Sequence, residues 1–303
     1  MIHSKHEKRL SARDIRKTFV RSNGWFARAS ETHALKGVSF DVEAGEIFGI
    51  VGESGCGKST LARILVGLEN ADGGSLSISG RTLFRADGPE LPPVQRGIQM
   101  VFQDPYASLN PRMKVGDVVA EGLAIAGVPR EERERRVAET LTLVGLSAAD
   151  SQKHAFQFSG GQRQRICIAR ALVMEPRFLV ADEAVSALDV SVQMQILNMI
   201  LDLRDRIGLS IIFITHDISV VEYICDRVMV MYDGRVVEHG PAQAVLDHPS
   251  EAYTQKLIAS VPRLASTADR RLSHDQNGPR RSVRATSLGG DLCQSQVSRS
   301  DGV

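Results

Sequence analysis

The chain has 303 residues, 43% of them hydrophobic, which is long and apolar enough for a sizeable buried core. Its 37 lysines and arginines balance 36 aspartates and glutamates, leaving a formal net charge of +1, so composition indicates neither nucleic acid nor a charged lipid surface as the main partner. The longest apolar runs fall far short of the roughly 18–20 residues of a membrane-spanning helix, and the charged N-terminus does not resemble a secretory signal. We therefore expect a globular protein of the cytosol.

Two segments near the N-terminus, 10–19 and 33–46, alternate apolar and polar residues. Such alternation is typical of strands that turn one face towards a core. We expect them to belong to a small antiparallel sheet.

A phosphate-binding loop is predicted at 52–60, where the sequence reads GESGCGKST. The stretch matches the pattern G-x-x-x-x-G-K-S/T in full and follows an apolar strand at 46–51. The helix predicted after it carries four apolar residues on one face, Leu61, Ile64, Leu65 and Leu68. A glycine-rich turn between strand and helix is sometimes only a tight turn, but the Lys-Ser-Thr in register favours phosphate binding.

The residues of this loop have different expected roles. Gly52, Gly55 and Gly57 let successive main-chain amides turn towards a β-phosphate, and the positive end of the helix dipole adds to the attraction. Lys58 is expected to bridge the β- and γ-phosphates, and Ser59 to ligate Mg²⁺. The predicted nucleotide-binding set of the loop is Gly52, Glu53, Ser54, Gly55, Cys56, Gly57, Lys58, Ser59 and Thr60.

The segment from about 103 to 165 has no convincing strand and is interpreted as a helical insertion in an α/β core. Its charged run REERERR, at 130–136, is interpreted as a solvated helix face with neighbouring opposite charges rather than as a binding surface. Gln103, where the core passes into the insertion, is expected to touch Mg²⁺ or the attacking water while linking the two lobes.

Two buried strands are predicted farther along the chain, at 177–183 and 209–217. Between them a helical pattern repeats the apolar residues Val192, Ile196, Met199, Ile200 and Leu203. Strands that alternate with helices indicate a parallel sheet covered on both faces.

Polar residues end both strands, at the edge where α/β sheets place their ligand sites. Asp182 is expected to support Mg²⁺ through water, and Glu183 to act as the general base that polarises the attacking water. His216 ends the next strand and is expected within reach of the γ-phosphate, although a lone histidine is more often a structural or surface group.

The segment from 263 to 303 is rich in serine, arginine and glycine and poor in apolar residues. It cannot bury enough surface to offset the entropy of ordering, so a disordered tail is predicted. Its mild positive charge leaves open a weak contact with acidic lipid or RNA, but a solvated tail is favoured.

A second glycine-rich stretch, FSGGQ at 158–162, completes a set of motifs that resembles the ATP-binding cassette family over residues 10–262. Phe158 stands where the family usually has leucine. The resemblance implies an α/β fold with a P-loop NTPase (RecA-like) core, a mostly parallel sheet, an N-terminal antiparallel β subdomain and an inserted α-helical subdomain. It also implies that four residues of the stretch contact the γ-phosphate of a nucleotide held by a second subunit: Ser159, Gly160, Gly161 and Gln162.

In this family two ATPase subunits pair head to tail around two shared nucleotide sites. The resemblance therefore implies that ATP closes the pair and that hydrolysis releases it. The loop SALD, at 186–189, is expected to cross the interface, with Asp189 as its contact. Whether the partner is a second copy of this chain or a close relative stays open.

Three longer stretches resemble the ATPase subunits of bacterial oligopeptide and dipeptide importers, including nickel and related solute systems, at 103–123, 182–197 and 248–262. The likeness implies ATP and Mg²⁺ as cofactors, and as partners a second ATPase subunit, two transmembrane permease subunits and an external solute-binding protein, with no nucleic acid. It implies a peripheral location on the cytoplasmic face of the cell membrane.

The same likeness suggests where such contacts lie. An importer-type segment is expected at about 240–262, and a groove for a cytoplasmic permease helix between Gln103 and about Gly127. Ala184 departs from the proline that many relatives carry after the catalytic glutamate, which is expected to alter loop stiffness more than chemistry. The transported solute is not specified by any residue of this chain.

Other interpretations remain beside this one. Phe19 is the first candidate for stacking on adenine, with Trp25 or Phe26 as alternatives. A cassette ATPase of DNA repair or translation is the alternative function, but such proteins usually carry two cassettes or long coiled coils, and this chain has neither. A nucleotide-binding regulator without turnover is disfavoured because Glu183 is present.

Overall fold

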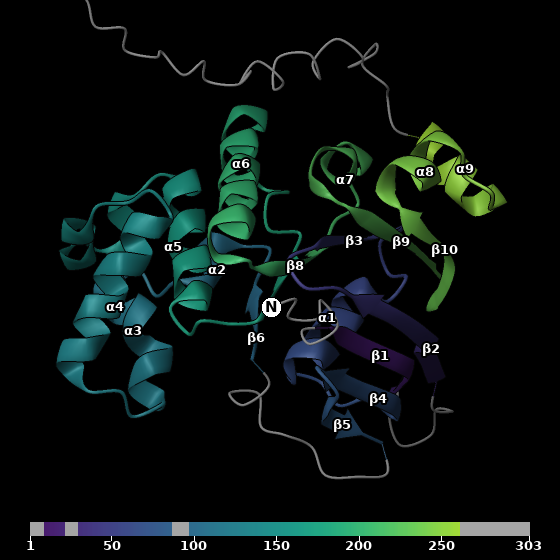
Figure 1. Ribbon diagram of the computed structural model, residues 1–303, viewed down its shortest axis with the longest axis horizontal. Coiled ribbons are helices and arrows are strands. Elements are labelled where there is room, and N and C mark those ends of the chain that lie inside the picture. The colour runs from purple at the N-terminus through teal and green to yellow at the C-terminus, as the bar shows by residue number, and fades with distance from the viewer. Residues whose placement is uncertain (1–8, 22–29, 87–96, 261–303) are drawn as a thin grey trace, which may run out of the picture. The chain divides into compact units, whose positions relative to one another are not determined.

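The structure is a computed structural model that describes residues 9–21, 30–86 and 97–260 (Figure 1). Trp25 and Phe26 lie outside the described residues, and so does the tail 263–303, so the predictions made for them stay predictions. In the part of the chain that is described, the strands form a four-stranded and a six-stranded sheet.

The four-stranded sheet has the order β2-β1-β4-β5, with antiparallel pairing throughout. Its strands are β1 (Leu10–Arg21), β2 (Ser30–Val42), β4 (Gly73–Ile78) and β5 (Arg81–Arg85). Leu10, Ala12 and Ile15 of β1 are fully buried, whereas Arg13 and Asp14 are exposed. Apart from a register shift between Ala12 and Ile15, the alternation turns one face of the sheet towards the core. The predicted N-terminal antiparallel sheet is confirmed.

The six-stranded sheet has the order β10-β9-β3-β8-β7-β6, and every pair except β9 with β10 is parallel. Its strands are β3 (Ile47–Val51), β6 (Ile98–Val101), β7 (Phe178–Asp182), β8 (Ser210–Ile214), β9 (Arg227–Tyr232) and β10 (Arg235–Pro241). All residues of β3, β7 and β8 are buried, as expected of central parallel strands with both faces covered.

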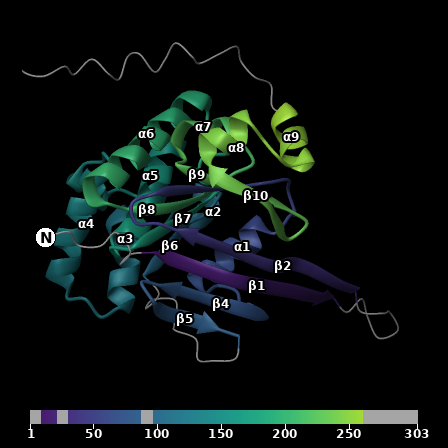
Figure 2. The same cartoon turned by 45° about the vertical axis from the view of Figure 1, so that its right-hand side comes forward.

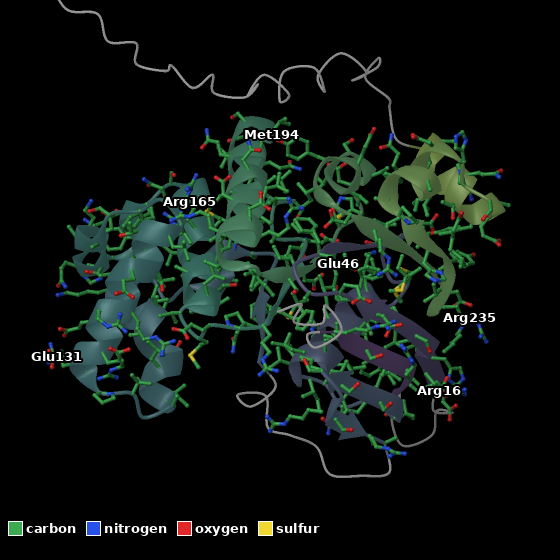
Figure 3. All side chains as sticks on the ribbon, viewed as in Figure 1. Arg16, Glu46, Glu131, Arg165, Met194 and Arg235 are labelled. Atoms are coloured by element: carbon green, nitrogen blue, oxygen red, sulfur yellow. The ribbon has the colours of Figure 1, made fainter. Side chains whose placement is uncertain are left out.

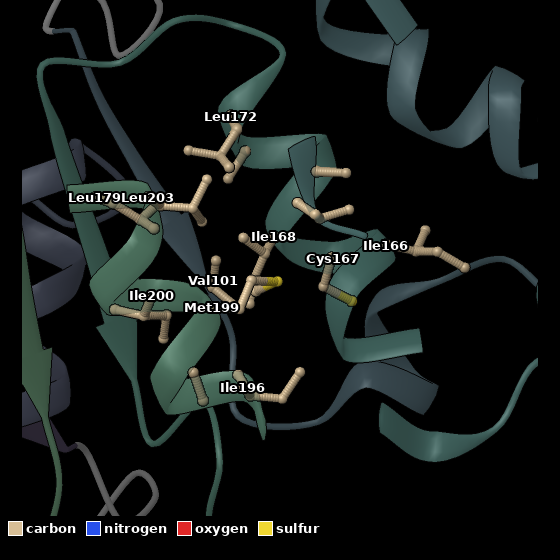
Figure 4. Close-up of a cluster of buried hydrophobic side chains, with 14 of the residues drawn as sticks. Val101, Ile166, Cys167, Ile168, Leu172, Leu179, Ile196, Met199, Ile200 and Leu203 are labelled. Atoms are coloured by element: carbon tan, nitrogen blue, oxygen red, sulfur yellow. The ribbon is translucent and has the colours of Figure 1, made fainter. Parts of the chain in front are cut away.

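The helices of the core lie on opposite faces of this sheet. They are α1 (Lys58–Val66), α5 (Gly160–Leu172) and α6 (Val190–Ile207). Phe178 and Val180 of β7 share one buried cluster with α1, whereas Leu179 and Ala181 share another with α5 and α6. Figure 4 shows the second cluster, in which side chains of α5 and α6 face each other.

The helical insertion contains α2 (Pro105–Ser108), α3 (Val115–Ile125), α4 (Arg130–Leu143) and two short 3₁₀ turns, Ala148–Gln152 and Ala155–Gln157. Its apolar residues, among them Val119, Val137 and Leu141, belong to the same cluster as α5 and α6. The limit drawn at 165 falls inside α5, which continues unbroken to Leu172. We therefore propose that the helical lobe extends to residue 172.

The charged run of α4 forms ion pairs within its own helix, as predicted. Arg130 pairs with Glu134 at 2.8 Å, and Arg135 pairs with Glu132 and Glu139, both at 2.6 Å. These are exposed pairs of the i,i+3 and i,i+4 kind, so each contributes little to stability. Figure 3 shows Glu131 of this helix at the edge of the molecule, like Arg16 and Arg235 elsewhere.

The last helices pack beside β9 and β10 (Figures 1 and 2). They are α7 (Ile218–Ile224), α8 (Ala242–Asp247) and α9 (Ala252–Ala259). A third buried cluster joins Ile258 of α9 and Val221 of α7 to Val51, the residue before the phosphate loop. The C-terminal helices thus share a core with the strand that leads into that loop.

The prediction that Leu68 lies on the buried face of α1 is wrong. Leu61, Ile64 and Leu65 are fully buried, but Leu68 is 57% exposed. The helix ends at Val66 because Gly67 adopts a left-handed conformation, φ 79°, and turns the chain away. Among the described residues no helix is long and apolar enough to cross a membrane.

Candidate functional site

The predicted phosphate loop connects β3 to the N-terminus of α1. Two of its positions require glycine, because the main chain of a neighbouring strand lies too close for a side chain. Gly52 has φ 153° and Gly57 φ 108°. A Cβ on Gly52 would lie 2.2 Å from the carbonyl oxygen of Met231, and one on Gly57 would lie 2.5 Å from that of Ala34. A side chain at either position would therefore displace the main chain of a neighbouring strand.

Lys58 directs its amine back across this loop. Its Nζ donates to the carbonyl oxygens of Gly52, at 2.7 Å, and Glu53, at 2.9 Å, and the residue is only 5% exposed. Among the described residues no carboxylate forms an ion pair with it. A buried ammonium held by carbonyl groups, next to a helix N-terminus, is suited to receive the phosphates of a nucleotide.

Ser59 and Asp182 bring two oxygen ligands together at the end of the sheet. The Ser59 hydroxyl donates to Oδ1 of Asp182 at 3.3 Å. Burial raises the pKa of Asp182 above its ordinary value, although the Ser59 hydrogen bond and the charges of Lys58 and Arg63 act in the opposite direction. A hydroxyl beside a buried carboxylate fits Mg²⁺, which prefers oxygen ligands and retains several waters.

Removing the charge of Asp182 is expected to stabilise the nucleotide-free protein at neutral pH. A carboxyl group whose pKa is raised by folding stabilises the fold below its unfolded-state pKa, and this stability is lost as the pH rises through the raised value. Asp182→Asn should therefore unfold at higher urea concentration than the parent at pH 7, with a smaller difference in acid.

Urea titrations without nucleotide or Mg²⁺, at a series of pH values, measure this effect. Asp202→Asn, at an exposed position on α6, is the matched control and should change little. An Asp182→Asn protein less stable than the parent at pH 7 would contradict the prediction.

Glu183 is held between the two other predicted catalytic residues. Its Oε2 accepts a hydrogen bond from Nε2 of Gln103 at 2.8 Å, and its Oε1 lies 3.2 Å from Nδ1 of His216. Its main chain has φ 48°, a left-handed conformation that non-glycine residues rarely adopt. The following turn is closed by Ser186, whose main-chain N–H and hydroxyl both donate to the Glu183 carbonyl.

The structure thus brings together Gln103, Glu183 and His216. With a hydrogen on Nδ1 the His216 ring donates to the carboxylate, and a hydrogen on Nε2 as well lets the same ring donate to a phosphate oxygen. The Gln103 amide nitrogen is used by Glu183, so the amide oxygen is the atom suited to Mg²⁺. This arrangement can orient a water molecule next to a γ-phosphate, but it requires the phosphate loop to place that phosphate.

The glycine-rich stretch at 158–162 lies on the other face of the sheet from α1. Ser159 is the N-cap of α5: its N–H donates to Oε1 of Gln162 at 3.0 Å, and its hydroxyl accepts from the Gln162 N–H at 3.4 Å. A Cβ on Gly161 would lie 2.4 Å from Val192 of α6. Ser159 is exposed at a helix N-terminus, whereas the departure Phe158 is buried.

The remaining predicted residues lie near these elements. Asp189 is exposed and is the N-cap residue of α6. Phe19 lies in β1 opposite Thr32, is 37% exposed, and has Nζ of Lys17 at 5.2 Å from its ring centroid. An exposed aromatic ring on this strand is consistent with adenine stacking, which stays a prediction.

One contact to the loop was not predicted from the sequence. The hydroxyl of Tyr253, in α9, accepts a hydrogen bond from the main-chain N–H of Glu53 at 3.1 Å. Two hundred residues separate the partners. The stretch 248–262 was singled out only as a family likeness, so no local pattern marked this tyrosine.

Comparison with known protein families identifies the family of this chain. The family model described as ABC transporter matches residues 35–186, which carry the phosphate loop, Gln103, the glycine-rich stretch and the Asp182–Glu183 pair. The chain belongs to the ABC transporter family. A second model, described as the C-terminal region of oligopeptide/dipeptide transporters, matches residues 237–290 of this ABC transporter chain.

Named relatives and a solved structure agree with that membership. The di/tripeptide transport ATP-binding protein DppF of Pseudomonas aeruginosa is 46% identical over 256 residues, covering 84% of this chain and 79% of DppF. The oligopeptide transport ATP-binding protein OppF of Streptococcus mutans is 44% identical, covering 83% of this chain and 82% of OppF. The ATP-binding cassette MJ0796, solved as a dimer in a post-hydrolysis state with ADP and Pi, is 28% identical with a TM-score of 0.65, covering 77% of this chain and 98% of MJ0796.

These matches confirm three predictions about this ABC transporter chain. Its family is confirmed, and so is its α/β fold with an antiparallel and a mostly parallel sheet. As a member of a family of ATPases it is an ATP-binding enzyme. The alternative of DNA repair or translation is not favoured, because the two named relatives are transport ATP-binding proteins.

Proposed function

We propose that this chain is the ATP-hydrolysing subunit of a bacterial importer for dipeptides, oligopeptides or related solutes. The observation that carries the proposal is the Glu183 carboxylate held by Gln103 and His216 at the strand ends beside the phosphate loop. The match of residues 237–290 to the C-terminal region of oligopeptide/dipeptide transporters supports the solute class.

In this proposal the phosphate loop and Asp182 bind MgATP. Lys58 and the loop amides hold the β- and γ-phosphates, Ser59 ligates Mg²⁺, and Asp182 supports the ion through water. Among the described residues no group of three or more His, Cys, Asp or Glu side chains could hold a metal ion by itself. The ion would therefore arrive with the nucleotide, whose phosphate oxygens supply the missing ligands.

Hydrolysis would use the three residues around Glu183. Glu183 orients and polarises the attacking water, and His216 contacts the γ-phosphate through Nε2. Gln103 links the site to the helical lobe, so that a change at the γ-phosphate can move that lobe. The left-handed main chain of Glu183 is consistent with a residue held in place for function.

A second ATPase subunit would complete the site. Ser159 and the N-terminus of α5 are separated from the chain's own α1 by the six-stranded sheet, and they are exposed for contact with a partner. A hydroxyl and helix amides closing on a γ-phosphate bind well only while that phosphate is present. The adjoining Asp189 would contact the same partner.

The transporter itself requires membrane subunits that this chain does not supply. We propose that the segment from Gln103 to about Gly127 receives a cytoplasmic helix of one of two permease subunits. The ATPase domain would span residues 10–262 and lie on the cytoplasmic face of the membrane, with a solute-binding protein on the other side.

Purification from membranes tests this proposal. The chain should copurify with a membrane permease, and membranes containing that permease should stimulate its ATPase activity, whereas nucleic acid should not. Failure to associate with any membrane protein, together with stimulation by nucleic acid, would overturn the importer assignment and favour the alternative.

A further inference from the structure

The phosphate loop is held from outside by the C-terminal helix α9. The hydroxyl of Tyr253, in the first turn of that helix, accepts the main-chain N–H of Glu53, the second residue of the loop, at 3.1 Å. The carbonyl of the same Glu53 accepts from Nζ of Lys58 at 2.9 Å. Glu53 is therefore hydrogen-bonded on one side to α9 and on the other to the amine of Lys58, which is proposed to bind the phosphates.

The start of α9 is fixed to the sheet by Glu238 of β10. One carboxylate oxygen of Glu238 accepts from the main-chain N–H of Ser250, at 2.9 Å, and from its hydroxyl, at 2.8 Å. The other accepts from the N–H of Glu251 at 3.2 Å. A charged acceptor that takes three hydrogen bonds at a helix N-terminus is a strong anchor.

The ring of Tyr253 is also braced. It lies against the ring of Tyr232, with the centroids 4.3 Å apart, and Ile258 of α9 belongs to the same buried cluster as Val51. Burial raises the pKa of the Tyr253 hydroxyl above its ordinary value, so the group stays neutral near physiological pH. Its position is thus set by packing as well as by the bond it makes.

We propose that Tyr253 is a positioning residue for ATP binding, through which the C-terminal region anchored by Glu238 holds the phosphate loop in its receptive conformation. The inference rests on the proposed ATP site. Both residues fall in 237–290, the region matched by the oligopeptide/dipeptide transporter model. That region therefore contributes to nucleotide affinity in this chain.

The test is Tyr253→Phe in the full-length chain, which removes the hydroxyl and keeps the ring. Without its acceptor the Glu53 N–H is left to other partners, and the receptive loop becomes a smaller fraction of the population. The Kd for ATP and the KM for hydrolysis should each rise about three- to tenfold, with kcat changed less than about twofold.

Tyr232→Phe is the matched control. It removes a hydroxyl from the neighbouring ring, and Glu53 is bonded to the hydroxyl of Tyr253, not to that of Tyr232. It should leave both Kd and KM unchanged. A purely structural role for Tyr253 would lower the active fraction and hence kcat without changing Kd. An unchanged Kd in Tyr253→Phe, or an equal rise in Tyr232→Phe, would overturn the inference.

Two further variants separate this inference from the proposed site. Glu238→Gln should weaken ATP binding in the parent but add little in the Tyr253→Phe background, because both act on one contact. Equal effects in both backgrounds would overturn the link from Glu238 through Tyr253. Lys58→Ala should abolish ATP binding, and if it does not, the proposed site itself fails, whatever Tyr253→Phe does.

Discussion

Glu183→Gln is expected to lower ATP hydrolysis by about 10²–10⁴-fold while ATP binding is retained, a loss of about 3–5 kcal/mol of transition-state stabilisation. The amide has the shape of the carboxylate and can still bond to Gln103 or His216, but it cannot accept a proton from the attacking water. The phosphate loop and Lys58 are untouched, so MgATP should still bind and still close the pair of ATPase subunits. The variant should accumulate as an ATP-bound dimer.

Hydrolysis assays and size-exclusion chromatography with MgATP measure the two halves of this expectation. Glu175→Gln is a close control, because Glu175 also has a left-handed main chain, φ 51°, but is exposed and pairs only with Arg136 among the recorded ion pairs of the described residues. It should behave like the parent in both assays. Rapid turnover by Glu183→Gln would remove Glu183 from the role of general base.

The core of the site was predictable because its geometry is local or follows from strand pairing. The phosphate loop is one continuous stretch whose glycines and Lys58 act where they stand. Asp182 pairs with Ile214 across β7 and β8, so the residues that follow the two strands, including Glu183 and His216, necessarily come close. Parallel pairing of β7 with β8 is enough to bring Glu183 and His216 close together.

The contacts that were not predicted join segments distant in sequence. Gln103 was expected to touch Mg²⁺ or water, and its direct hydrogen bond to Glu183 depends on how β6 lies beside β7. None of β6, β9 and β10 is predicted from the sequence: β6 and β10 are the edge strands of the sheet, β6 has only four residues, and β9 lies between β10 and β3. The bond between Tyr253 and Glu53 depends on the same unpredicted strands, which place α9.

The predicted length of α1 is wrong for a local reason. Leu68 fits the helical period of α1, yet the left-handed Gly67 ends the helix before it. The Ser159 capping box begins α5, which no glycine or proline interrupts between Gln162 and Leu172, so a lobe limit at about 165 falls inside this helix. Periodicity locates helices, and capping residues decide where they begin and end.

Ser159→Trp is expected to abolish hydrolysis that depends on subunit pairing, by at least about 100-fold, while the isolated subunit keeps its affinity for ATP within about twofold. Ser159 is exposed and lies on α5, on the opposite face of the sheet from α1 and its phosphate loop. A bulky ring at the start of α5 would therefore keep a partner's γ-phosphate away from the helix amides. It would leave the chain's own Lys58 and loop amides as they are.

The substitution also removes a helix cap, and this effect must be separated from the loss of pairing. Ser147→Trp is the matched control, because Ser147 is another exposed N-cap serine with a capping box in the helical lobe. Both variants should lose about 1 kcal/mol of stability, but only Ser159→Trp should lose hydrolysis. ATP titrations of dilute subunits and ATPase rates over a range of protein concentrations decide the case: if the dilute Ser159→Trp subunit lost its affinity for ATP, Ser159 would belong to its own chain's site and the shared arrangement would be wrong.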